Sequence, residues 1–185
     1  MVLLTSLAPK LGTQMPPFTL PDVHGNMHKS QDFIQSQALL VVFMCNHCPY
    51  VRAIEDRLIA LAHTYEQSQL QVLGICSNDW TQYPQDTPQQ LSARWHEKNY
   101  GFPYLLDETQ QVAKDFHAVC TPEFFLYDQQ RTLYYTGRFD DNWQHASQVT
   151  QNELEQALQA LLAGDSPPTI QHPSMGCSIK WRPQQ

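Results

Sequence analysis

Two patterns of apolar residues alternate along the chain, and they predict alternating strands and helices. A continuous apolar run, typical of a strand buried on both faces of a sheet, covers residues 38–44, and mostly apolar runs at 70–76, 102–106 and 123–127 predict further strands. Apolar residues that recur every three or four positions, the period of a helix with one buried face, follow over about 48–66 and 88–99. A helix separates the first two strands at the spacing of a βαβ unit, so we expect them to be parallel.

Weaker signals complete the order of elements. A Gly/Asn/Asp-rich turn between short alternating runs predicts a β-hairpin within residues 12–29, and residues 133–138 should pair antiparallel with 123–127. A brief capped helix is expected after the third strand, and the capping box at 150–153 opens a last helix that Gly164 ends. The order predicts an α/β fold, with a central mixed β-sheet flanked by helices and an N-terminal β-hairpin extension.

Composition and charge are those of an ordinary soluble protein. The 185 residues, 42% of them hydrophobic, suit a domain at 12–164 with an N-terminal segment at 1–11 and a Pro-rich polar tail at 165–185. The net charge of −7 argues against nucleic acid or an anionic membrane as the main partner. The N-terminus does not resemble a signal peptide, and no stretch approaches the length of a membrane span. We therefore expect a cytoplasmic location.

The candidate chemistry lies in Cys45 and Cys48, which are spaced C-x-x-C where the first strand gives way to the first helix. Unpaired N–H groups and the helix dipole at such a junction favour an anion, so a thiol placed there ionises more readily. Pro49 fits the first turn of a helix, where its missing N–H is not needed. Five cysteines in a cytosolic chain indicate redox or metal chemistry, and their number alone does not choose between the two.

Three motifs together resemble the thioredoxin-fold superfamily, and more narrowly its peroxiredoxin-like branch of alkyl hydroperoxide reductases and thiol-specific antioxidant proteins. They are the segment Pro17–Asp22 followed by Gly25, the redox motif Cys45-Asn46-His47-Cys48-Pro49, and Thr121-Pro122 at the start of a later strand. The resemblance covers about residues 12–163 and implies a thioredoxin-like fold. The end of the chain around Gly176–Trp181 is similar to that of a poorly characterised subgroup of these proteins.

The resemblance also implies roles for these residues. Cys45 would be the exposed attacking thiolate, and Cys48 would resolve the mixed disulfide. Asn46 and His47 would tune the couple, since an imidazolium at His47 stabilises a thiolate at Cys45; the alternative is that His47 is a solvent-facing spacer. Thr121-Pro122 resembles the cis-proline loop that faces the cysteine pair, the alternative being an ordinary trans proline.

The chain departs from both family patterns. A peroxiredoxin carries a proline, then a threonine or serine three residues before its peroxidatic cysteine, and an arginine nearby. If Cys48 is aligned with that cysteine, Val41 stands in place of the proline and Cys45 in place of the threonine or serine. No arginine is close to Thr121 in the sequence. Thioredoxins carry a buried aspartate where this chain has Leu39, so proton transfer from Cys48 needs another group or water.

The other three cysteines carry weaker signals. Cys76 ends a buried strand, as an inert core residue would. Cys120 precedes Thr121-Pro122, and structural and relay roles both stay open. Cys177, next to Gly176 in a tail that we expect to be mobile, is either a third redox cysteine that swings to the site or a surface thiol.

The sequence therefore predicts a thiol–disulfide oxidoreductase that acts through Cys45 and Cys48 on protein or small-molecule disulfides. We expect disulfide substrates and a thiol reductant, such as a thioredoxin or glutathione system, as partners, with no nucleic acid, membrane, cofactor or metal. One alternative is a peroxiredoxin-like thiol peroxidase that reduces hydroperoxides through Cys48 or Cys45.

Two further alternatives belong to other classes of protein. A copper- or other metal-binding module would use the cysteine pair with His47 or another histidine. A regulatory interaction protein would use its aromatic loops, which carry Trp80, Tyr83 and Trp143, as a binding surface, although such aromatics also cover core edges.

Overall fold

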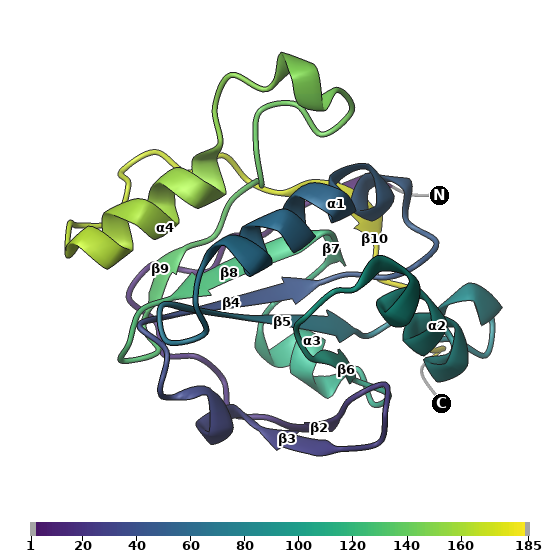
Figure 1. Ribbon diagram of the computed structural model, residues 1–185. Coiled ribbons are helices and arrows are strands. Elements are labelled where there is room, and N and C mark those ends of the chain that lie inside the picture. Colours follow the sequence, from purple (N-terminus) through teal and green to yellow (C-terminus); the bar gives the residue numbers. More distant parts are fainter. Residues whose placement is uncertain (1–2, 184–185) are drawn as a thin grey trace.

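The computed structural model describes residues 3–183, and a five-stranded sheet forms its centre (Figure 1). The strand order is β6–β5–β4–β8–β9. These strands are β4 (Ala38–Phe43), β5 (Leu70–Cys76), β6 (Tyr104–Leu106), β8 (Glu123–Tyr127) and β9 (Leu133–Tyr135). β4, β5 and β6 are parallel, whereas β8 and β9 are antiparallel to their neighbours. The mixed sheet and its parallel first pair are thus confirmed.

Both faces of the sheet are covered, which explains why every residue of β4 is buried. Leu40 and Val42 pack in the cluster that includes the apolar sides of α1 (Pro49–Thr64), α2 (Pro88–Lys98) and α4 (Glu153–Ala163). Leu39 and Val41 point to the opposite face, because successive side chains of a strand alternate. That face is covered by α3 (Gln111–Asp115) and by the hairpin of β2 (Thr19–Pro21) and β3 (Met27–Lys29).

Local signals set most helix ends. Pro49 and Pro88 stand in the first turns of α1 and α2, and Gly164 adopts the left-handed conformation, φ 80°, that ends α4. Short 3₁₀ turns complete the connections: η1 (Ser30–Phe33), η2 (Pro84–Asp86) and η3 (Ala146–Gln148). The predicted hairpin and the four predicted helices are confirmed.

A second, three-stranded sheet joins the two ends of the chain to the core. Its order is β1 (Leu3–Thr5), β10 (Met175–Ser178) and β7 (Cys120–Thr121), all antiparallel. Cys177 lies in the central strand of this sheet with 1% of its surface exposed. The prediction of a mobile tail around Cys177 is therefore wrong, because β10 is paired along both of its edges.

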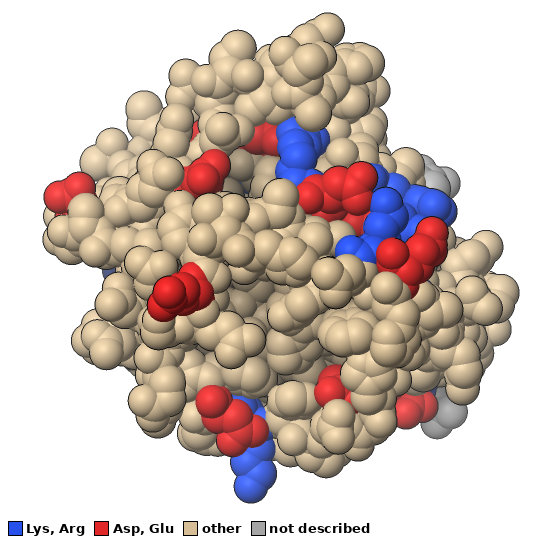
Figure 2. Space-filling view, viewed as in Figure 1, with Lys and Arg blue, Asp and Glu red and all other residues tan. Residues whose placement is uncertain are grey.

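Charges of both signs are interspersed on the face seen in Figure 2, where basic side chains lie beside acidic ones. Within residues 3–183, no helix combines the length and the apolar character that crossing a membrane requires.

The buried carboxylate of Glu55 allows a test of the packing of α1 against α2. Glu55 is 1% exposed, and its carboxylate accepts hydrogen bonds from Arg94 and Tyr100. We expect Glu55→Ala to lower the free energy of unfolding by about 3 kcal/mol, because it leaves the partly buried Arg94 without its counter-charge. Thermal unfolding should show a Tm lower by roughly 6–12 °C. Asp56→Ala, which removes an exposed ion pair to Lys98, is the matched control and should change stability by under about 1 kcal/mol; equal effects would contradict this account.

Candidate active site

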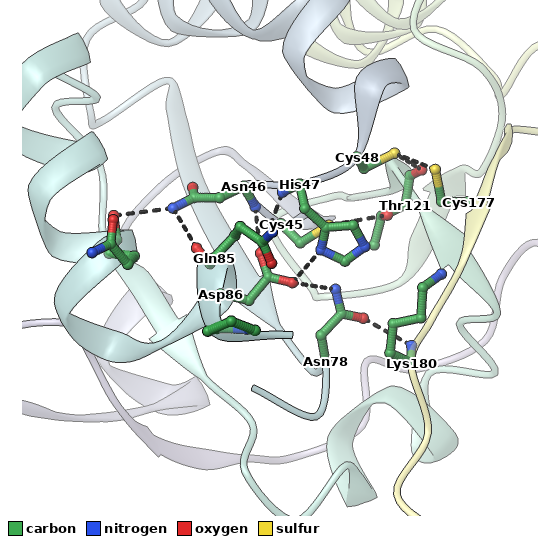
Figure 3. A network of polar contacts seen from close by, with 12 residues as sticks. Cys45, Asn46, His47, Cys48, Asn78, Gln85, Asp86, Thr121, Cys177 and Lys180 are labelled. Carbon is green, nitrogen blue, oxygen red and sulfur yellow. Dashed lines mark hydrogen bonds and ion pairs between the residues drawn. The ribbon is translucent and has the colours of Figure 1, made fainter. Parts of the chain in front are cut away.

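Cys45 and Cys48 lie where β4 ends and α1 begins (Figure 3). Cys48 is the N-cap residue of α1, so its sulfur is close to the unpaired N–H groups of the first turn. Both residues are buried, with exposed fractions of 1% for Cys45 and 0% for Cys48. The expectation of an exposed Cys45 is wrong, because the segment after β5 and strand β10 cover this end of the sheet.

The Thr121–Pro122 peptide is cis, as predicted, and it faces both cysteines. The Sγ of Cys45 lies 3.5 Å from the Thr121 Oγ1, and the Sγ of Cys48 lies 3.0 Å from the Thr121 carbonyl oxygen. The alternative of an ordinary trans proline at position 122 is therefore excluded. The loop between β7 and β8 forms one wall of the site.

Cys177 brings a third sulfur to the site from the other end of the chain. Its Sγ lies 2.9 Å from the Sγ of Cys48, and its backbone is in register with Thr121 across the β10–β7 pair. Figure 3 shows the sulfurs of Cys48 and Cys177 side by side next to Thr121. The structure thus brings together the predicted pair and Cys177, although it does so through a strand and not through a mobile tail.

Hydrogen bonds favour a negative charge on Cys48. The thiol of Cys45 donates to its sulfur, and the Cys177 thiol and the backbone N–H of Val51 also stabilise the thiolate, so the pKa of Cys48 is lowered to about 5. Burial acts in the opposite direction but does not prevail. The Thr121 side chain also lowers the pKa, and the Thr121 carbonyl accepts a hydrogen bond when Cys48 is protonated.

Cys45 is in the opposite situation. Complete burial raises its pKa well above the ordinary value for a thiol, and the neighbouring Cys48 and the Asp86 carboxylate raise it further. The directions of the two pKa shifts favour a negative charge on Cys48 over one on Cys45, with one proton between the two sulfurs. This distribution is the reverse of the one that the sequence predicts.

The Asp86 carboxylate, which no sequence motif marks, organises the loop between the cysteines. Asp86 is completely buried and accepts hydrogen bonds from the backbone N–H groups of Asn46 and His47 at 2.8 and 3.3 Å. Its other oxygen lies 2.6 Å from the His47 Nδ1 and accepts a 2.8 Å hydrogen bond from the Asn78 side chain. The carboxylate therefore fixes both the backbone and a ring of the redox motif (Figure 3).

Both residues between the cysteines are also fixed by other contacts. The Asn46 side chain donates to the carbonyl oxygens of Gln85 and Gln90 at 3.0 Å each. The His47 ring stacks on Tyr83 with 5.1 Å between the ring centroids, and only 12% of its side chain is exposed. The alternative of a solvent-facing spacer at His47 is therefore wrong. Tyr83 packs on the redox motif, which gives one of the predicted aromatic loops a place at the site.

The remaining two cysteines are poor nucleophiles. Burial raises the pKa of both Cys76 and Cys120 far above neutrality. The Sγ of Cys120 contacts the Glu123 carboxylate at 3.7 Å, and the same oxygen accepts hydrogen bonds from the N–H groups of Val119 and Cys120. Glu123 is itself a completely buried acid, whose pKa burial raises. These contacts support a structural role for Cys120 and the inert core role of Cys76.

A metal ion would find three ligand atoms close together here. Cys45, His47 and Asp86 each offer one, and these lie within 4.8 Å of one another. His47 and Asp86 already bind each other at 2.6 Å, so an ion would have to replace this contact. The donors suit a borderline metal such as Zn²⁺ or copper.

A cleft of about 330 Å³ lies beside the cis proline, between α1 and the segments around residues 138–143 and 172–175. Its apolar lining includes Tyr50, Pro122 and Trp143, and the rings of Tyr50 and Trp143 are 4.2 Å apart. Tyr50 follows Cys48 by two residues, so the cleft reaches the start of α1. It offers an apolar surface next to the redox motif.

Fold and comparisons together define a thioredoxin-fold redox enzyme. Two solved structures of low identity show the thioredoxin-like fold. The thioredoxin domain of a thiol-disulfide oxidoreductase from Bacteroides vulgatus is 17% identical with a TM-score of 0.59, over 70% of this chain and 89% of that chain. Peroxidoxin BcpB from Mycobacterium tuberculosis is 18% identical with a TM-score of 0.61, over 85% of this chain and 99% of that chain.

The chain belongs to the AhpC/TSA family, whose model matches residues 11–136. It is much more similar to an uncharacterized conserved protein from Geobacillus kaustophilus, with 41% identity and a TM-score of 0.95 over 100% of this chain and 99% of that chain. A hypothetical protein from Sinorhizobium meliloti 1021 is 42% identical with a TM-score of 0.93, over 97% of this chain and 99% of that chain. No curated protein matches the chain. The two relatives cover the C-terminal segment, which the family model does not.

Proposed function

We propose that the protein is a thiol–disulfide oxidoreductase in which Cys48 attacks and Cys45 completes the exchange. The observation that carries the proposal is the position of Cys48 at the N-cap of α1, where two neighbouring thiols and the backbone N–H of Val51 lower its pKa to about 5. A thiolate is the nucleophile in disulfide exchange, and this one exists at neutral pH. The roles of the two cysteines are thus exchanged relative to the sequence prediction.

The reaction proceeds in two balanced steps. The Cys48 thiolate attacks one sulfur of a substrate disulfide, a mixed disulfide forms, and the other substrate sulfur leaves as a thiolate. Cys45 then loses its proton and attacks the Sγ of Cys48, which forms a Cys45–Cys48 disulfide and releases the second substrate sulfur. The substrate gains two electrons, and a thiol reductant such as a thioredoxin or glutathione system returns them to the protein. Asp86 contributes by holding the loop that carries both sulfurs.

Reduction of insulin disulfides by dithiothreitol tests this proposal. We expect catalytic amounts of the protein to accelerate the reduction, and alkylation after denaturation should show that the protein passes through a state with one disulfide that includes Cys48. Cys76→Ser, which changes a buried cysteine outside the site, is the matched control and should retain the activity. A protein without acceleration and without a disulfide at Cys48 would contradict the proposal.

Reduction of hydroperoxides is the second candidate, favoured by the low pKa of Cys48 and by the AhpC/TSA family. Here the thiolate attacks the O–O bond, becomes a sulfenate and releases an alcohol or water. Arg138 lines the cleft beside Pro122, but its guanidinium is paired with Glu153 and not directed at a sulfur. We therefore expect slow peroxide consumption. Rapid consumption with a sulfenate trapped on Cys48 would favour this second function.

A further inference from the structure

We propose that Cys177 is a third redox residue, which takes the disulfide from Cys48 before Cys45 does, and that strand β10 is built to hold it there. The inference rests on the proposed function, because it assigns the step that follows the attack of Cys48. Cys177 is 1% exposed, and its Sγ lies 2.9 Å from that of Cys48. An S–S bond of about 2.05 Å is within reach of a small side-chain movement.

A glycine allows β10 to approach the cis-proline loop this closely. A Cβ added to Gly176 would lie 2.1 Å from the carbonyl oxygen of Thr121 and 3.1 Å from the nitrogen of Pro122. Both contacts are with backbone atoms, which cannot turn away as a flexible side chain would. Any other residue at position 176 therefore pushes β10 away from the loop and separates Cys177 from Cys48.

The segments on either side of Cys177 are fixed by partners from distant parts of the chain. Up to and including Cys177, β10 pairs with β1, and Leu3 lies opposite Cys177. After it, the N–H of Ile179 donates to the Val119 carbonyl at 2.9 Å, and the N–H of Lys180 donates to the Asn78 side chain at 2.9 Å. Asn78 also donates to Asp86, so the same side chain links the strand of Cys177 to the loop of Cys45 and Cys48.

The charges around the sulfurs agree with this order of the two steps. Burial, the hydrogen bond to Cys48 and the charge of Cys48 raise the pKa of Cys177 to about 12, while Lys180 lowers it. Once Cys48 is in a mixed disulfide, its negative charge is gone and Cys177 retains the favourable effect of Lys180. Cys45 still faces the unfavourable charge of Asp86. Cys177 therefore reacts first because its Sγ already lies 2.9 Å from that of Cys48, and the loss of the Cys48 charge removes one cause of its raised pKa.

The transfer balances atoms and electrons. Cys177 loses a proton and attacks the Sγ of Cys48, a Cys48–Cys177 disulfide forms, and the remaining substrate sulfur leaves and takes up the proton. Cys45 then attacks the same Sγ of Cys48, forms the Cys45–Cys48 disulfide and expels Cys177 as a thiol. The protein loses two electrons in total, as in the direct route. Cys48 is the shared sulfur of both disulfides.

Acid quenching of the wild-type protein at set times tests the order, because the Cys48–Cys177 disulfide should appear before the Cys45–Cys48 disulfide, and a Cys45→Ser background traps the intermediate. The reduced variant is mixed with one equivalent of hydroxyethyl disulfide, quenched with acid after set times, alkylated and mapped by mass spectrometry. We expect the Cys48–Cys177 disulfide to accumulate and two equivalents of mercaptoethanol to be released. Adding Cys177→Ser should leave a stable mixed disulfide on Cys48 and one equivalent released, whereas adding Cys76→Ser as the matched control should change nothing.

Gly176→Ala in the same background tests the role of the strand with all other thiols present. We expect the Cys48–Cys177 disulfide to form at least about tenfold more slowly, since the added methyl group separates the two sulfurs. In Cys45→Ser, a mixed disulfide that persists on Cys48 while Cys177 is recovered as an alkylated free thiol would overturn this inference and leave the proposed function intact. Absence of any mixed disulfide on Cys48 in the variant that lacks both Cys45 and Cys177 would overturn both.

Discussion

Cys48→Ser will abolish disulfide exchange, and the rate of insulin reduction should fall by at least about a hundredfold, to the background of the reductant. A serine hydroxyl forms neither a thiolate at neutral pH nor a mixed disulfide. Cys45 does not replace it, because burial and the Asp86 carboxylate raise its pKa well above the ordinary value. Cys76→Ser is the matched control and should keep the wild-type rate. A Cys48→Ser variant with substantial activity would assign the attack to another cysteine.

The pH dependence of thiolate absorbance in the wild-type protein should also identify Cys48 as the ionised thiol. The Cys48 thiolate is protonated as the pH falls through about 5, so thiolate absorbance near 240 nm should be lost there in the wild type and be missing in Cys48→Ser. The native pKa lies below the ordinary value of about 8.5 for an unfolded thiol, so the native state binds fewer protons between these values. The contribution of Cys48 to stability is therefore complete above about pH 8.5 and is lost as the pH falls through about 5. If absorbance near 240 nm is still lost around pH 5 in Cys48→Ser, the assignment of this pKa to Cys48 is contradicted.

Asp86→Asn should have the second largest effect, on both stability and the redox motif. One oxygen of Asp86 accepts from two backbone N–H groups, which an amide oxygen can still do. The other oxygen faces the His47 ring and the Asn78 amide, and an NH₂ group there opposes the Asn78 donor. A buried donor without its acceptor costs about 1–3 kcal/mol, so we expect a Tm lower by roughly 2–12 °C.

The same substitution should also redistribute the proton between the two cysteines. The Asp86 charge is one cause of the high pKa of Cys45, so its removal lowers that pKa and weakens the preference for a thiolate on Cys48. Asp56→Asn, at an exposed side chain of α1, is the control and should change neither Tm nor thiolate absorbance measurably. If Asp86→Asn behaves like Asp56→Asn, the carboxylate does not organise the site.

Much of the fold can be predicted from local patterns, because these patterns report burial directly. The run at 38–44 is apolar throughout because β4 is the middle strand of a sheet covered on both faces, and its parallel partner follows at βαβ spacing. The Cys45–Pro49 motif and Thr121-Pro122 can also be read in the sequence, and the resemblance to thioredoxin-fold proteins implies the cis form that the structure has. These signals identify the C-x-x-C motif and the proline loop that faces it.

The missed features depend on contacts between distant segments. β10 has four residues, one of them Gly176, and shows no alternating pattern; its pairing with β1 and β7 is fixed by backbone contacts across the whole length of the chain. Asp86 lies in the segment that follows β5, beside the end of β4, since the carboxyl ends of neighbouring parallel strands meet at one edge. That adjacency is the signal from which its role was predictable. The order of attack depends on the charge of Asp86 and on burial, so it does not follow from the motif alone.

The central claim is that Cys48, and not Cys45, is the reactive thiolate. Two matched double variants isolate the candidates: Cys45→Ser with Cys177→Ser keeps Cys48, and Cys48→Ser with Cys177→Ser keeps Cys45. At pH 6, less than one equivalent of hydroxyethyl disulfide should yield a mixed disulfide on Cys48 in the first variant, mapped by mass spectrometry, and none on Cys45 in the second over the same time. Faster adduct formation on Cys45 than on Cys48 would contradict the account.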